Sequence, residues 1–137
     1  MRISITLALL AACGSPAEPM EFDAAIELSS CVDEAFVRER ILLRRCVDGP
    51  CHGRRNPQAN LDLQREGAGD RMMGVTSIHE ACADRELVVP GQARASFLMD
   101  KVLGLQGSCG DLMPPTGGML SLEERRCLVT WIDSMEF

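Results

Sequence analysis

The sequence predicts a small, mainly α-helical single domain whose helices are separated by long loops rich in glycine and proline. Three observations favour this fold class. The 137 residues suit one hydrophobic core rather than two. Apolar side chains recur at helical spacing in residues 33–46 and 121–135. The chain also has 12 glycines and 7 prolines, many of them gathered in residues 104–118.

The first residues are typical of an export signal. Met1-Arg2 precedes an apolar run, residues 3–10, which is shorter than the about 20 residues that a membrane-spanning helix needs. The sequence Leu10-Ala11-Ala12-Cys13 then resembles the bacterial lipobox, in which the cysteine is lipidated and becomes the mature N-terminus. We therefore expect residues 1–12 to be a lipoprotein signal peptide, the alternatives being an ordinary signal peptide with a coincidental cysteine or a truncated start.

Residues 13–30 are expected to form the lipidated N-terminus and a flexible tether, because Pro16 and Pro19 lie there among small and acidic residues. The chain would then be an exported bacterial lipoprotein at the periplasmic face of the envelope, with the outer membrane favoured, or at the cell surface. Its net charge of −6 adds no attraction to anionic lipid, so the acyl chains alone would hold it. The same charge argues against nucleic-acid binding.

The folded domain is expected to span residues 31–137. Its first helix, residues 33–46, has apolar pairs four residues apart and stops at Gly49-Pro50, where proline lacks a backbone donor. Further along, the pattern favours a short helix weakened by glycine, an extended run and a second clear helix, over residues 66–75, 87–89 and 93–103.

The last helix, residues 121–135, has the clearest local signals. Ser121 and Glu124 form a capping box, in which each side chain accepts the other residue's backbone N–H group. An apolar stripe follows at Leu128, Trp131, Ile132 and Met135. The chain has one tryptophan, four phenylalanines and no tyrosine, so disulfides, a metal or a cofactor are expected to organise its long loops.

The segment from Cys46 to His52 carries the main chemical signal. Two cysteines, the second followed directly by histidine, form the pattern that covalent haem attachment needs. In such sites each thiol adds to one vinyl group of the haem porphyrin, and the histidine binds the iron as an axial ligand. The usual spacing leaves two residues between the cysteines, whereas here there are four. Gly49 and Pro50 could bulge out as a turn and leave the Cys51-His52 adjacency intact.

Met113 is the favoured second axial ligand, because Pro114 and Pro115 would stiffen the loop that carries it. A methionine ligand favours ferrous iron and raises the reduction potential. Met119 is the closest rival, and His79 is a second candidate whose alternative role is that of a surface or capping residue. Two arginines, Arg54 and Arg55, follow the segment from Cys46 to His52. They could pair with haem propionates or remain solvated charges.

A series of short motifs follows in order along residues 32–135: Cys-x4-Cys-His-Gly from Cys46 to Gly53, Asn60-Leu61-Asp62-Leu63, Val88-Val89-Pro90-Gly91, Ala95-Ser96-Phe97-Leu98, Lys101-Val102, Cys109-Gly110, Met113-Pro114-Pro115 and Trp131-Ile132. The series resembles the cytochrome c-like domains of predicted lipoproteins from myxobacteria and planctomycetes. The resemblance implies a cytochrome c-like fold with haem c bound through thioethers at Cys46 and Cys51. It also implies His52 as the proximal iron ligand and Met113 as the distal one.

Six cysteines follow Cys13. If haem takes two of them, four remain for two disulfides, whereas a haem-free chain could form three disulfides. The even number of cysteines therefore does not decide whether haem is bound. An exported chain in which no cysteine is left unpaired fits an oxidising compartment. Four cysteines allow three pairings. Among these we expect Cys82–Cys109, which would clamp the loop of residues 104–118 that carries Met113 (the distal loop), and Cys31–Cys127, which would tie the terminal helices together.

These observations support two functional hypotheses. The first is a membrane-tethered electron-transfer protein with His/Met-ligated haem c, which is not an enzyme, is expected to be monomeric and would meet an unspecified redox partner protein. The second is a haem-free structural or interaction module, in which Cys46 and Cys51 form a disulfide and Met113 packs as an apolar side chain. A zinc site at Cys46, Cys51, His52 and another cysteine is a lesser option, because exported thiols tend to oxidise.

Overall fold

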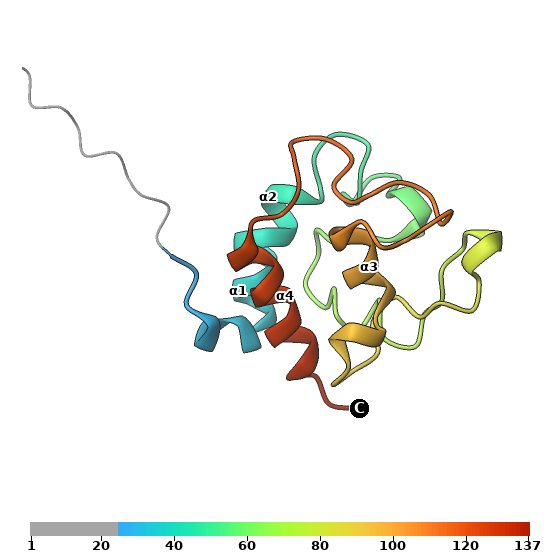
Figure 1. Ribbon diagram of the computed structural model, residues 1–137. Coiled ribbons are helices and arrows are strands. Elements are labelled where there is room, and N and C mark those ends of the chain that lie inside the picture. The colour runs from blue at the N-terminus through green and yellow to red at the C-terminus, as the bar shows by residue number, and fades with distance from the viewer. Residues whose placement is uncertain (1–24) are drawn as a thin grey trace, which may run out of the picture.

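Residues 25–137 are described by a computed structural model, in which helices are joined by long loops and no sheet forms (Figure 1). The prediction of a mainly α-helical chain is confirmed at this level. The expected signal peptide, Cys13 and most of the expected tether fall in residues 1–24 and lie outside the described residues. No helix in residues 25–137 has the length and apolar character needed to cross a membrane.

The described elements are short. The α-helices are, in chain order, α1 (Glu34–Val37), α2 (Leu43–Arg45), α3 (Phe97–Leu103) and α4 (Leu122–Asp133). Single 3₁₀ turns lie at Leu28–Val32, Gln58–Asn60, Glu80–Cys82 and Ala93–Ala95. Two isolated bridges join Met73 to Val88 and Thr76 to Glu86, so residues 87–89 are extended, as the sequence predicts.

The first predicted helix is present as one continuous helix over residues 34–45. Its middle turn, Arg38–Leu42, is wound as a π-helix between α1 and α2. Asp33 caps the N-terminus by accepting a backbone N–H group at 2.9 Å. The buried side chains of this helix are Val37, Ile41 and Leu42. Because the helix is anchored in the core, it fixes the position of Cys46, which follows it directly.

Helix α4 begins with the predicted capping box. Ser121 Oγ accepts the N–H group of Glu124 at 3.1 Å, and Glu124 Oε2 accepts the N–H group of Ser121 at 2.6 Å. The side chains that α4 buries are Cys127, Leu128, Trp131 and Ile132. The helix packs on the turn Leu28–Val32 and on α1, and the expected disulfide between Cys31 and Cys127 fastens it there.

The helix predicted over residues 93–103 is interrupted. A 3₁₀ turn at its start is separated from α3 by Ser96, whose backbone is extended with φ −82° and ψ 125°. The Ser96 hydroxyl accepts the N–H group of Val89 at 2.9 Å and donates to the carbonyl oxygen of Gln92 at 3.0 Å. This side chain therefore competes with helix formation at the point where the predicted helix breaks.

The prediction of a short helix over residues 66–75 is wrong, since the structure has turns and no helix there. Gly67 and Gly74 adopt positive φ angles of 75° and 65°. A right-handed helix cannot continue through such a conformation, and the segment instead folds back along the core, where Met72 is fully buried.

Buried side chains form two clusters. The larger one joins residues 34–45, α4 and Met72. The smaller one consists of Cys82, Phe97 and Cys109, and it contains the second expected disulfide, Cys82–Cys109. The long loop of residues 104–118 leaves α3 and runs along the top of the view to α4 (Figure 1).

Candidate cofactor-binding site

The two extra residues of the Cys46–His52 segment form a turn at the surface. Gly49 has a φ of 55° and no atom within 4 Å of the position of an added Cβ, and Pro50 is exposed. Beneath this turn, the N–H group of His52 donates to the carbonyl oxygen of Cys46 at 2.9 Å. The loop therefore closes on itself and keeps His52 next to the end of the helix despite the wider cysteine spacing.

The His52 ring is oriented by a backbone carbonyl. Its Nδ1 lies 3.1 Å from the oxygen of Leu61, and because a carbonyl oxygen only accepts, Nδ1 carries the hydrogen. Nε2 is then left with its lone pair, the arrangement usual for a metal-ligating histidine. Burial lowers the pKa of His52 below its ordinary value of 6.5, against the opposing effect of backbone hydrogen bonds. The neutral, ligating form of the ring is thereby favoured at neutral pH.

The carbonyl of Leu61 is itself held in place by the Cys51-His52 pair. The N–H group of Gln58 donates to the oxygen of Cys51 at 2.8 Å, and that of Leu63 donates to the oxygen of His52 at 2.8 Å. These two hydrogen bonds join both ends of residues 58–63 to the Cys51-His52 pair. Rotation of the imidazole away from Leu61 would leave this carbonyl without its partner.

Cys46 and Cys51 are free thiols, whereas the other four cysteines in residues 25–137 are paired. Burial, opposed by the nearby charge of Arg45, raises the pKa of Cys46 to about 12. The thiol therefore stays protonated at neutral pH, unlike the thiolates that bind zinc. Within the described residues, no group of three or more His, Cys, Asp or Glu side chains is arranged to hold a metal ion.

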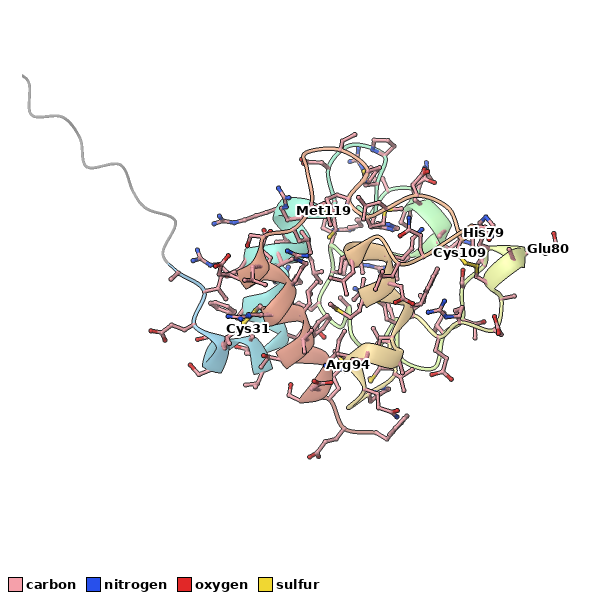
Figure 2. The ribbon with its side chains drawn as sticks, viewed as in Figure 1. Cys31, His79, Glu80, Arg94, Cys109 and Met119 are labelled. Carbon is pink, nitrogen blue, oxygen red and sulfur yellow. A yellow bond between two sulfur atoms is a disulfide. The ribbon has the colours of Figure 1, made fainter. Side chains whose placement is uncertain are left out.

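Met113 is held in the long loop by α3. Its N–H group donates to the carbonyl oxygen of Lys101 at 2.8 Å, and its side chain is half-buried. Met119 is 49% exposed and does not line the cavity described below. His79 is exposed but lies at the cavity, beside the loop that carries Cys109 (Figure 2). Of the two candidate methionines, the structure thus places only Met113 at the site.

A single cavity of about 590 Å³ brings the predicted residues together. Cys46, Cys51, His52 and Met113 all line it. The volume falls within the range of about 300–1,000 Å³ that is usual for small-molecule and cofactor sites. Apolar side chains make up much of the remaining wall, among them Leu61, Leu63, Met72, Leu87, Phe97, Leu98 and Val102. The cavity therefore offers an apolar chamber with two thiols, one imidazole and one thioether at its surface.

Arg54 and Arg55 lie elsewhere. They line a separate hollow together with Gly49, Gly53 and Gln64, so the structure does not place them as partners for a group in the main cavity. Sequence reasoning missed the cations that do line it, namely Arg44, Arg45, Arg71 and Lys101. Arg44 and Arg45 could have been found from their position immediately before Cys46, whereas the sequence holds no such signal for Arg71 and Lys101.

Arg45, which lines the cavity, also binds the chain at the end of the loop of Met113. Its Nη2 donates to the carbonyl oxygens of Gly118 and Met119, both at 3.0 Å, and its Nε lies 3.5 Å from Oε1 of Glu124. The end of α2 is thereby fastened to the distal loop and to the first turn of α4. The position of Arg45 at the cavity therefore depends on contacts with residues far apart from it in the chain.

Comparison of the chain with models of known protein families, with curated proteins and with solved structures finds no match.

Proposed function

We propose that this protein is an electron-transfer protein of the cytochrome c type, with haem c attached at Cys46 and Cys51 and its iron held by His52 and Met113. The observation that carries the proposal is that one apolar cavity is lined by all four of these side chains, although Met113 lies far from the others in sequence. The two thiols at this cavity are also the ones that the disulfides leave free among residues 25–137.

The thiols are suited to covalent attachment. Each S–H group would add across one vinyl double bond, with sulfur bonding to one carbon and hydrogen to the other, so no group leaves. Cys46 is fixed by the end of a helix, and Cys51 is adjacent to His52, which couples the second thioether to the iron ligand. The surface turn at Gly49 and Pro50 accommodates the two extra residues without changing this adjacency.

The bound haem would supply one-electron exchange at its iron. Leu61 holds His52 through Nδ1 and thereby presents Nε2 as the ligating atom. Met113 would offer its thioether, which favours ferrous iron and raises the potential. The apolar wall lowers the local dielectric and limits access of water. The proposed role is electron transfer, which transforms no substrate.

The first experiment is expression of the full chain in a host that matures c-type cytochromes. We expect a strong Soret band, haem that resists acid–acetone extraction, and a mass equal to the peptide plus its lipid and one haem. The double variant C46A/C51A should lose covalent haem. A colourless wild-type protein with a third disulfide, Cys46–Cys51, would instead establish the haem-free module.

A pair of methionine variants tests the axial ligand. M113A should keep its covalent haem, lose the charge-transfer band of methionine-ligated ferric iron and show a lower reduction potential. M119A is the matched control, because Met119 lies in the same stretch of chain but away from the cavity. Equal spectra and potentials for M113A and the wild type would remove Met113 from the iron.

We also propose that the protein is exported and anchored by lipid at Cys13, on the strength of the Leu10-Ala11-Ala12-Cys13 sequence. Labelled fatty acid should be incorporated by the wild type and not by C13S. The wild-type chain should also sediment with membranes. Recovery of the unlabelled wild-type chain in the soluble fraction would contradict this part of the proposal.

A further inference from the structure

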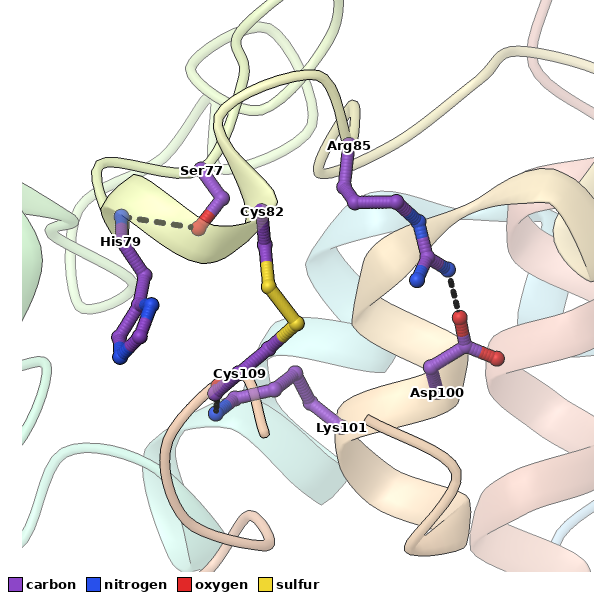
Figure 3. Close-up of a disulfide and its surroundings, with 7 residues drawn as sticks. All are labelled: Ser77, His79, Cys82, Arg85, Asp100, Lys101 and Cys109. Carbon is purple, nitrogen blue, oxygen red and sulfur yellow. Dashed lines mark hydrogen bonds and ion pairs between the residues drawn. A yellow bond between two sulfur atoms is a disulfide. The ribbon is translucent and has the colours of Figure 1, made fainter. Parts of the chain in front are cut away.

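Lys101 of α3 contacts both ends of the loop segment that carries Met113. Its carbonyl oxygen accepts the N–H group of Met113 at 2.8 Å, and its Nζ donates to the carbonyl oxygen of Cys109 at 2.9 Å. Figure 3 shows the second of these bonds beside the Cys82–Cys109 disulfide. One residue on a helix thus holds residues 109–113 through its backbone and through its side chain.

The ammonium group has a confined position. It lies 5.7 Å from the centroid of the Phe97 ring, within cation–π range. A Cβ atom placed on Gly110 would lie 3.4 Å from Nζ, so the loop approaches the ammonium closely where glycine stands. Lys101 is half-buried and lines the same cavity as His52 and Met113. A positive charge is therefore held at the wall of the proposed haem site.

Two other cations that line this cavity are bound to other segments. Arg45 and Arg71 bind backbone carbonyls of these segments. Asp111, on the same loop as Met113, is exposed. Burial lowers the pKa of Lys101, whereas the negative charge of Asp111 acts to raise it and so favours the charged ammonium. Lys101 lines the cavity, and its side chain bonds to the loop between Cys109 and Met113.

We propose that Lys101 is a positioning residue for Met113 and that its ammonium charge raises the reduction potential of the iron. The loop clamp would keep the thioether at the metal. A fixed cation opposes the additional positive charge of ferric iron more than that of ferrous iron, especially in an apolar surrounding. The inference rests on the proposed haem function and adds a residue that the resemblance does not assign to the site.

The test uses full-length, haem-loaded protein with the substitutions K101M and K101R. Imidazole competes with methionine for ferric iron, so its affinity measures how firmly Met113 is held. We expect K101M to bind imidazole about tenfold more tightly, the size of effect usual for supporting groups around a metal site. The equilibrium constant for one-electron reduction should fall about tenfold, equivalent to about 59 mV.

The control is R94M, which removes one positive charge from the exposed turn before α3 (Figure 2). It should change neither quantity. K101R keeps the charge but has a different head group, so its potential should stay close to that of the wild type while imidazole affinity rises. If K101M does not fold, K101Q carries the same expectation for both quantities.

The outcomes separate the inference from the function on which it rests. Haem-loaded K101M with wild-type imidazole affinity overturns the positioning role, and an unchanged potential overturns the electrostatic role, while haem binding would stand in either case. A wild-type chain that takes up no haem would overturn the proposed function before any Lys101 variant is measured.

Discussion

Glu34 at the start of α1 accepts a hydrogen bond from the backbone N–H group of Gly69, with 3.1 Å between Oε2 and the nitrogen. Its other carboxylate oxygen accepts the N–H groups of Gly67 and Ala68 at 2.6 and 2.9 Å. One side chain thus satisfies three successive backbone donors. This contact fastens the first helix to the segment that leads to Met72, which lines the candidate site.

Replacement of Glu34 by glutamine should therefore destabilise the fold. The glutamine side chain would keep one accepting oxygen but turn an NH₂ group toward one of the backbone donors. We expect E34Q to lower the free energy of unfolding by about 2 kcal/mol, because hydrogen bonds to a charged acceptor are lost. Urea denaturation measures this loss, with E39Q as the control, since Glu39 is exposed on the same helix. Equal losses in the two variants would contradict the assigned role.

Gly69 should not tolerate a side chain. An added Cβ would lie 3.0 Å from Oε2 of Glu34, 3.1 Å from Cε of Met135 and 3.3 Å from Cζ2 of Trp131. We expect G69A to lower the free energy of unfolding by about 1–3 kcal/mol through overpacking. In an M135A background, which frees part of this space, G69A should cost less. Strict additivity in this double-mutant cycle would exclude crowding against Met135 as the cause.

The helical features that sequence reasoning predicts correctly depend on local signals. The capping box at Ser121 and the apolar stripe of α4 involve residues three or four apart, so the pattern alone specifies them. The two disulfides join distant residues. Their pairing is predicted from where the cysteines lie relative to the terminal helices and the distal loop, and the structure contains both. The adjacency of Cys51 and His52 is likewise visible in the sequence.

The features that were missed depend on contacts between distant segments. Nothing near Lys101 in the sequence indicates that its ammonium reaches Cys109, and nothing near His52 indicates that Leu61 orients its ring. The break at Ser96 results from a bond to Val89, which only the folded chain brings close. Helical periodicity alone therefore extended the predicted helix through residues 93–95.

The two disulfides should differ in what their removal changes. Cys31–Cys127 closes a loop of 96 residues and Cys82–Cys109 one of 27, and a longer loop restricts the unfolded chain more. We expect C31A/C127A to lower the free energy of unfolding by about 3–5 kcal/mol, and C82A/C109A to cost less. In haem-loaded protein, however, C82A/C109A should have the larger effect on imidazole binding, because it frees the distal loop. The reverse order in denaturation by guanidinium would contradict the loop-length argument.

Asp62 is buried, and its carboxylate accepts several hydrogen bonds. Its side chain is 5% exposed, Oδ1 accepts the N–H groups of Gln64 and Arg65 at 2.8 and 3.2 Å, and Oδ2 pairs with the Arg65 guanidinium at 2.5 Å. Burial by itself raises the pKa of Asp62, but these hydrogen bonds outweigh it, and the pKa lies below the ordinary value of 3.8. The folded state therefore binds the proton less tightly than the unfolded state.

It follows that ionised Asp62 stabilises the fold above pH 3.8, and that this contribution is lost as pH falls through the lowered pKa of the folded state. We expect D62N to reduce the free energy of unfolding at pH 7 by about 1 kcal/mol, a modest value because the Arg65 partner is largely exposed. The difference from the wild type should shrink steadily as urea denaturation is repeated below pH 3.8. D70N, at an exposed carboxylate nearby, should show no comparable change. If the free energy of unfolding of D62N stays below that of the wild type by a constant amount across this pH range, the charge of Asp62 is not what stabilises the fold.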